Sequence, residues 1–133
     1  MTSAKRFEEL ECWQTARKLN KEIYLAPREV KDFGFTNQIR RASLSIVSNI
    51  AEGFESRTQI LFIDYLGRAK ASAGEVRAQL HVGKDLQYFT DQSSSELIQL
   101  VEFTSRQIYK LIKYLETLPN KHRISENGST YLI

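Results

Sequence analysis

Cysteine, proline, glycine and long apolar runs are all scarce in this sequence of 133 residues. A single cysteine excludes an intramolecular disulfide, and with only two histidines it offers no zinc-ligand spacing. Two prolines and six glycines exclude collagen-like and low-complexity chains, and 41% hydrophobic residues exclude a disordered one. No apolar run approaches the roughly 20 residues that cross a bilayer, and the N-terminus has no apolar signal core. We therefore expect a soluble, cytoplasmic, single-core protein.

The charge balance is mildly basic. Nineteen Lys and Arg residues against 16 Asp and Glu residues give a formal net charge of +3. This excess permits an anionic partner without requiring one, because many proteins without such a partner carry as much.

Apolar residues recur at alternating steps of three and four in four segments, the spacing of one helix face. No segment alternates with period two, so the sequence predicts an all-α fold. Short connections favour an antiparallel, up-down-up-down four-helix bundle within a single domain, residues 1–120, followed by a loose tail, residues 121–133. The predicted helices cover residues 8–25, 36–53, 58–88 and 94–118.

Helix boundaries follow from capping residues. Thr36 is the expected N-cap of the second helix, and Gly53 its left-handed C-cap. Ser56 or Thr58 precedes the third helix, and Ser93–Ser95 opens the fourth.

Residues suited to catalysis or metal binding are few. His81 adjoins a core position, His122 falls in the predicted tail, and Cys12 occupies a core-facing site. Glu52 and Glu75 could approach each other or a divalent cation, but a salt bridge with Arg40, Arg41 or Arg77 is the favoured interpretation. We predict no catalytic residue, no metal and no cofactor.

One enzymatic alternative remains. Arg77 and His81 stand one helical turn apart, which resembles the Arg-to-His spacing of a helical ribonuclease class, the higher eukaryotic and prokaryotic nucleotide-binding domains. That class has more intervening residues than this chain. An exposed histidine on a helix flank is the simpler interpretation.

Basic residues are more informative by position than by number. Lys110 and Lys113 recur beside Tyr109 and Tyr114, and cations with stacking aromatics suit RNA or single-stranded DNA. An ordinary solvated face is the equally supported alternative. The candidate nucleic-acid contacts on the two middle helices are Arg40, Arg41, Arg68, Lys70, Arg77 and Lys84.

The third helix also carries a stripe of small residues, Gly67, Ala71, Gly74 and Ala78. Interior glycines cost roughly 1 kcal/mol each relative to alanine, which is tolerated where another helix must approach closely. That helix belongs either to the same bundle or to another subunit, and we favour the subunit contact.

The segment Gln38–Gly53, QIRRASLSIVSNIAEG, resembles the signature of the four-helix bundle protein family encoded by intervening sequences within bacterial 23S ribosomal RNA genes. The similarity extends from Phe7 to about Pro119. It implies a bundle that assembles into a homopentameric ring with a basic surface. One relative, the accessory variability determinant of diversity-generating retroelements, binds nucleic acid and a reverse transcriptase, which implies similar partners here.

Polar residues of this signature are interleaved with apolar ones, so some must be hydrogen-bonded against a partner helix or subunit. We predict that they specify structure, with a ligand site as the alternative. The predicted structural residues are Ser48, Asn49, Glu52, Gly53, Ser72 and Glu75.

Together these observations predict a non-enzymatic, oligomeric bundle, most simply a pentamer, that binds RNA or DNA electrostatically and does not enter membranes. Two alternatives stay open: a protein-binding scaffold with no nucleic-acid role, and a ribonuclease that uses Arg77 and His81.

Overall fold

The computed structural model describes residues 3–119 and 131–132. The predicted all-α class with four helices is confirmed, and no described helix is long and apolar enough to cross a membrane. A short 3-10 helix, η1 (Phe7–Glu9), precedes the first helix, and β1 (Ser3–Ala4) pairs antiparallel with β2 (Tyr131–Leu132). The helices are α1 (Glu11–Leu25), α2 (Phe33–Phe54), α3 (Gln59–Asp85) and α4 (Asp91–Glu116).

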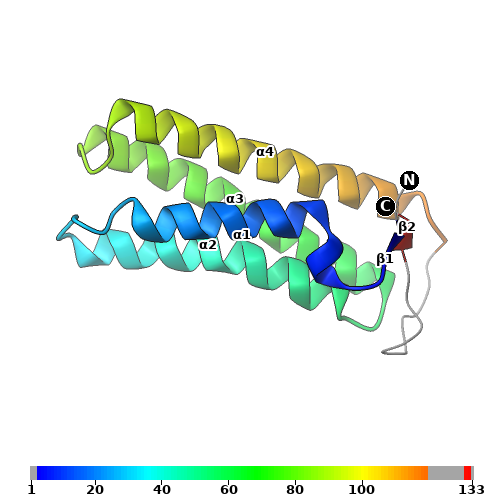
Figure 1. The fold of residues 1–133 in the computed structure, drawn as a ribbon. Helices are drawn as coiled ribbons and strands as arrows, with labels where there is room; N and C mark the ends of the chain where they lie inside the picture. The colour runs from blue at the N-terminus through cyan, green and yellow to red at the C-terminus, as the bar shows by residue number, and fades with distance from the viewer. Residues whose placement is uncertain (1–2, 120–130, 133) are drawn as a thin grey trace.

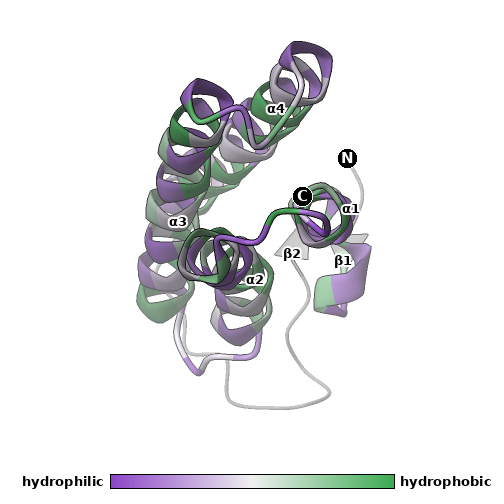
Figure 2. Ribbon diagram, turned by 90° about the vertical axis from the view of Figure 1, so that its left-hand side faces the viewer, coloured by the Kyte–Doolittle hydropathy of each residue, from purple (hydrophilic) through white to green (hydrophobic). Residues whose placement is uncertain are grey.

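The four helices lie side by side (Figure 1). Helix α2 packs against α1 and α3, and α4 completes the bundle by packing against α3 and α1. The α1–α2 and α3–α4 connections lie at one end, which faces the viewer in Figure 2, and the α2–α3 connection lies at the other. Each helix therefore has two neighbouring helices and one outward face.

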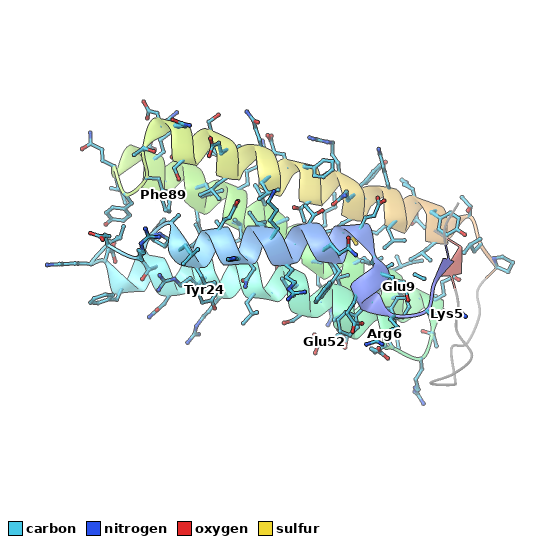
Figure 3. The ribbon with its side chains drawn as sticks, viewed as in Figure 1. Lys5, Arg6, Glu9, Tyr24, Glu52 and Phe89 are labelled. Carbon is cyan, nitrogen blue, oxygen red and sulfur yellow. The ribbon has the colours of Figure 1, made fainter. Side chains whose placement is uncertain are left out.

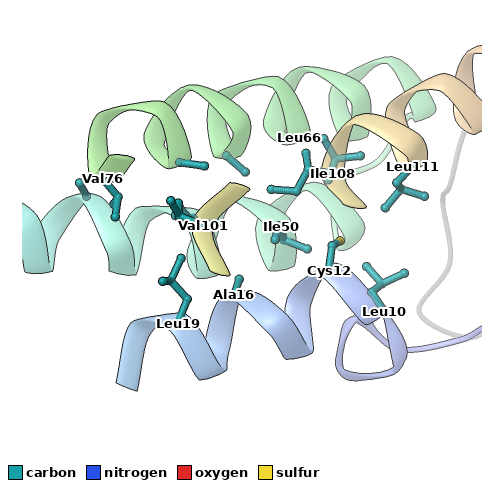
Figure 4. Close-up of a cluster of buried hydrophobic side chains, with 14 of the residues drawn as sticks. Leu10, Cys12, Ala16, Leu19, Ile50, Leu66, Val76, Val101, Ile108 and Leu111 are labelled. Carbon is teal, nitrogen blue, oxygen red and sulfur yellow. The ribbon is translucent and has the colours of Figure 1, made fainter. Parts of the chain in front are cut away.

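The core consists of the apolar stripes that the periodicity predicts (Figure 4). Burying one large aliphatic or aromatic side chain stabilises the fold by about 1.5–3 kcal/mol, so these stripes supply most of the driving force. The largest fully buried side chains are Leu19 and Ile23 of α1, Ile39, Ile46 and Ile50 of α2, Phe62, Leu66, Val76 and Leu80 of α3, and Val101, Ile108 and Leu115 of α4.

Two helices begin earlier than predicted. Asp32, rather than Thr36, caps α2, because its carboxylate accepts a hydrogen bond from the Phe35 N–H at 3.1 Å. Thr36 is buried inside the helix. Thr90 caps α4 in front of the predicted Ser93–Ser95. The α1–α2 and α3–α4 connections each contain more than one residue able to cap a helix. The residue that does so is the one directly before the first helical residue, Asp32 before α2 and Thr90 before α4.

Gly53 is not the left-handed cap that the sequence suggested. It lies within α2, which continues to Phe54, and no glycine among the described residues has a positive φ. A Cβ atom on Gly53 would stand 2.7 Å from the Cβ of Tyr65 and 3.0 Å from Cδ1 of Phe62, both on α3. The glycine is therefore needed because α2 and α3 approach closely at this point.

A hydrogen bond joins the two connections at one end of the bundle. The Tyr88 hydroxyl donates to Oδ2 of Asp32 at 2.7 Å, and the Tyr88 ring packs edge-on against Phe35 at 5.1 Å between centroids. The bond from Tyr88, and then the one from the Phe35 N–H, lowers the pKa of Asp32 below its ordinary value of 3.8. The same bond to Asp32 raises the pKa of Tyr88 above its ordinary value of 10.0.

This pair predicts a pH dependence of stability. A lowered carboxyl pKa contributes stability above pH 3.8 that is lost as pH falls through the folded value, and a raised hydroxyl pKa contributes stability below pH 10.0 that is lost as pH rises. We expect Tyr88→Phe to have a lower melting temperature than the wild-type protein between pH 3.8 and pH 10.0. Outside these limits the difference between the two melting temperatures should become smaller. Melting curves across the pH range measure this, and two parallel profiles would contradict it.

The N-terminal end is held by aromatic contacts. The Phe7 ring of η1 meets the Trp13 ring edge-on, with centroids 5.1 Å apart, and the Arg17 guanidinium carbon lies 5.5 Å from the Trp13 centroid. These contacts dock η1 on α1. The predicted tail, residues 121–133, lies outside the described residues apart from Tyr131–Leu132.

Candidate nucleic-acid interface

The six cations predicted to bind nucleic acid do not share one face. Lys70 and Arg77 line a groove between α3 and α4, whereas Lys84 lines a separate hollow at the α3–α4 turn. Arg41 and Arg68 are exposed on α2 and α3. The structure therefore brings only Lys70 and Arg77 of the six together in one groove.

Arg40 has a structural contact. Its Nη2 donates to the backbone carbonyl of Tyr24 at 2.8 Å, and its guanidinium carbon lies 5.4 Å from the centroid of the Tyr24 ring. Tyr24 belongs to the last turn of α1 (Figure 3), where helix carbonyls lack partners within the helix. Arg40 thus ties α2 to the end of α1.

The groove between α3 and α4 has a volume of about 230 Å³. Lys70 and Arg77 line it from α3, and Ser105 and Arg106 line it from α4. Its one carboxylate is Glu102, whose Oε2 lies 3.7 Å from Nε of Arg77. Three cations less one carboxylate leave a formal charge of +2. Both partners of the ion pair are partly exposed, so it adds little to stability and leaves the groove cationic.

Small residues contribute to the lining of the groove on the α3 side. Ala73 and Gly74 of α3 line it together with Val101 of α4. A Cβ atom on Gly74 would meet nothing within 4 Å. A polyanion could therefore approach the α3 backbone closely while its phosphates contact the flanking cations.

Charge distinguishes this groove from two other hollows on the surface. The hollow between α1 and α4 carries Lys18, Glu22 and Glu96, one cation less two carboxylates, or −1. The hollow at the α3–α4 turn carries Lys84, Asp85 and Asp91, again −1. Of the three, the α3–α4 groove alone would attract phosphate.

Three charged or polar residues of the groove, Glu102, Ser105 and Arg106, were missed by sequence reasoning. They lie next to or between the predicted core residues Val101, Thr104 and Ile108, so periodicity could have placed them at the edge of the core face. Which part of α3 they oppose depends on the register of the two helices. The sequence alone does not provide that register.

Exposed aromatic rings accompany the cations of α4. Tyr109 is 49% exposed, and Nζ of Lys113 lies 5.5 Å from the centroid of its ring. Phe103 is 46% exposed, with the Arg106 guanidinium carbon 5.9 Å from its centroid. Tyr114 instead packs half-buried against the core, so it is less accessible for stacking than the sequence suggested.

The polar residues of the signature form a hydrogen-bonded contact between α2 and α3. The hydroxyls of Ser45 and Ser72 lie 3.0 Å apart. The Asn49 amide donates to the backbone carbonyl of Ser45 at 2.8 Å and to its hydroxyl at 2.9 Å. Ser45, which sequence reasoning did not single out, links the two predicted residues Asn49 and Ser72.

The other polar residues predicted to specify structure, Ser48, Glu52 and Glu75, lie outside this contact. Ser48 and Glu52 are exposed, and Figure 3 shows Glu52 at the surface. Glu75 is exposed and accepts a hydrogen bond from the Gln79 amide at 3.1 Å. Arg77, considered as a partner for these carboxylates, pairs with Glu102 instead.

The predicted small-residue stripe faces outward. Gly67, Ala71, Gly74 and Ala78 are all exposed, and Cβ atoms on the two glycines would meet nothing within 4 Å. The stripe therefore does not pack against another helix of this chain. A contact with another subunit stays a prediction.

Two of the residues considered for catalysis lie on different helices, Cys12 on α1 and His81 on α3. His81 is exposed on α3, and burial raises the pKa of the Cys12 thiol to about 12, so this thiol is unreactive near neutral pH. The described residues contain no group of three His, Cys, Asp or Glu side chains able to hold a metal ion. His122 lies outside the described residues.

Comparison with known proteins identifies the family. The profile of the "23S rRNA-intervening sequence protein" family matches residues 8–110. A crystal structure of a protein with unknown function from the S23 ribosomal protein family, from Bacteroides thetaiotaomicron, has a similar fold. It has a TM-score of 0.71 and 21% sequence identity, covering 77% of this chain and 98% of that one. No curated protein matches this chain significantly. Because the profile match spans most of the sequence, this chain belongs to the 23S rRNA-intervening sequence protein family.

Proposed function

We propose that this protein is a non-enzymatic, oligomeric, cytoplasmic four-helix bundle, antiparallel and up-down-up-down, that binds RNA or DNA electrostatically. The observation that carries the proposal is the +2 groove between α3 and α4, since the two hollows compared with it above among the described residues carry −1 each. Neutralising phosphates releases counterions, which gives affinity without sequence preference. Lys70 and Arg77 are the central contacts, and Arg41, Arg68 and Lys84 are further candidate contacts outside the groove.

The outward stripe on α3 supports assembly into a ring. Gly67, Ala71, Gly74 and Ala78 leave the α3 backbone accessible to a helix of a second subunit. Family resemblance favours five subunits. Gly74 belongs to both the stripe and the groove, so the proposal puts nucleic acid beside the subunit boundary.

Charge reversal tests the nucleic-acid role. We expect Lys70→Glu with Arg77→Glu to weaken binding to RNA and DNA at least tenfold, about 1.4 kcal/mol, because phosphate contacts become repulsive. Affinity is measured by filter binding at several salt concentrations. Light scattering and the absorbance ratio of purified protein report the subunit number and co-purified nucleic acid.

The matched control is Lys21→Glu with Lys31→Glu, which changes the net charge equally on α1 and on the α1–α2 connection. It should weaken binding by less than about threefold, since neither side chain lines the groove and salt screens exposed charges. Equal losses in both double variants would show that net charge, not the groove, drives binding. Absence of binding by the wild-type protein at low salt would reject the function.

A protein-binding scaffold is the second candidate. It is favoured by large apolar side chains on the surface, with Phe33 68% exposed and Ile60 55% exposed. Pull-downs with and without nuclease distinguish the two candidates. Partners retained after nuclease treatment, with no nucleic acid bound to the pure protein, would favour the scaffold.

A further inference from the structure

The outward face of α4 carries aromatic rings and cations in alternation. Phe103, Arg106, Tyr109, Lys110 and Lys113 are all exposed. Phe103, Arg106, Tyr109 and Lys113 follow one another at steps of three or four residues, and Lys110 lies seven residues after Phe103, so all five share one helix face. This face adjoins the α3–α4 groove on one side, because Arg106 also lines the groove, and the hollow between α1 and α4 on the other, because Phe103 lines that hollow.

The aromatic rings are accessible although neither is needed for the core. Tyr109 and Phe103 keep about half of their surface in contact with solvent, at 49% and 46%. Each lies beside a cation, Lys113 at 5.5 Å and Arg106 at 5.9 Å from the ring centroids. Exposing such rings gains nothing from the hydrophobic effect, so a stacking partner would explain their position.

Phosphate attraction alone does not distinguish a single strand from a duplex. Aromatic rings do, because a base offers its flat surface to a side chain only when it is not stacked within a helix. A duplex would contact the same cations, but neither ring would have a base to stack on.

Resting on the proposed function, we propose that the α3–α4 groove and the outer face of α4 bind a single-stranded polynucleotide in preference to a duplex. Its phosphates contact Lys70, Arg77 and Arg106, and its bases stack on Tyr109 and Phe103. Ser105 donates to a phosphate oxygen. Glu102 restrains Arg77 and weakens binding. RNA and DNA single strands share this chemistry.

The test compares strands of about 16 nucleotides, the upper range of single-strand site sizes, with a duplex of equal length. Fluorescence anisotropy at about 50 mM salt measures affinity for oligo-U, oligo-dT and the duplex. We expect both single strands to bind more tightly than the duplex. A preference of oligo-U over oligo-dT would identify RNA as the ligand, and the reverse would identify DNA.

Substitutions at Tyr109 separate stacking from charge. Tyr109→Leu should weaken single-strand binding about fivefold or more while changing duplex binding less than about twofold, since one stacked base is lost. Tyr109→Phe keeps the ring and should bind as wild type does. An equal loss for single strand and duplex in Tyr109→Leu would overturn the stacking role.

Glu102→Gln gives a gain of binding, which a misfolded variant could not produce. Removing the carboxylate frees Arg77, so affinity for the single strand should rise and the logarithmic salt slope should steepen by up to about 0.7. Glu29→Gln in the α1–α2 connection raises the net charge by the same amount outside the groove, and as the control it should leave the slope unchanged.

The outcomes separate the two proposals. Duplex affinity equal to or above that of single strands would overturn the single-strand inference and leave the proposed function standing. If neither ligand binds, the proposed function fails as well. If Glu102→Gln has the same affinity for the single strand as the wild-type protein, the groove is not part of the binding surface.

Discussion

Replacing Phe62 by alanine should lower the free energy of unfolding by about 3–5 kcal/mol, the largest loss expected from a single substitution in this chain. Phe62 has no exposed surface, and its ring packs edge-on against Phe54 with centroids 5.8 Å apart. The loss combines the missing transfer free energy with a cavity between α2 and α3 that rigid helices cannot close. Small domains are stable by only about 5–15 kcal/mol, so much of the stability would be lost.

Urea unfolding at a fixed protein concentration measures this effect, since assembly would make stability depend on concentration. Ile60→Ala on the same helix is the control, because Ile60 is 55% exposed and its truncation should change stability by less than about 0.5 kcal/mol in an isolated subunit. Similar losses in the two variants would contradict the placement of Phe62 in the core.

Adding one methyl group to Gly53 should destabilise the protein by about 1–3 kcal/mol, even though alanine favours helix formation over glycine. The new Cβ atom would approach the Cβ of Tyr65 to 2.7 Å and the backbone oxygen of Phe62 to 3.3 Å. Neither atom is the end of a flexible side chain, so α2 and α3 would have to move apart.

The same substitution at Gly67 should have the opposite sign. Its Cβ atom would meet nothing within 4 Å, so Gly67→Ala should stabilise an isolated subunit by about 0.5–1 kcal/mol through helix propensity. Calorimetry of Gly53→Ala and Gly67→Ala compares the same chemical change, one added methyl group, at a closely packed and an open position. Two losses of equal size would show that Gly67 is also closely packed, as it would be in an assembly.

The fold was largely predictable because the hydrophobic effect acts on a pattern visible in the sequence. Apolar steps of three and four in α3 and α4 identified core residues such as Leu66 and Ile108, and of the two predicted caps of α3, Ser56 and Thr58, the structure has Thr58. The role of Gly53 was not predictable. A glycine near a helix end suits both a left-handed cap and a close helix contact, and only the packing of α2 on α3 distinguishes them.

The candidate site was predictable only in part. Lys70 and Arg77 lie seven residues apart, so the periodicity of α3 puts them on one face. The participation of Arg106 depends on the register of α4 against α3, and the diversion of Arg40 to the Tyr24 carbonyl depends on how α1 ends. Both are properties of the packed bundle. Local sequence patterns do not contain them.

The contacts of Trp13 give this protein a local optical reporter. Trp13 is the single tryptophan of the chain and is held between Phe7 and Arg17, where η1 docks on α1. Its intrinsic fluorescence therefore senses this junction, whereas far-ultraviolet circular dichroism averages over every helix. Coincident transitions from the two signals would indicate cooperative opening of the whole subunit, and an earlier fluorescence change would mean that the junction frays first.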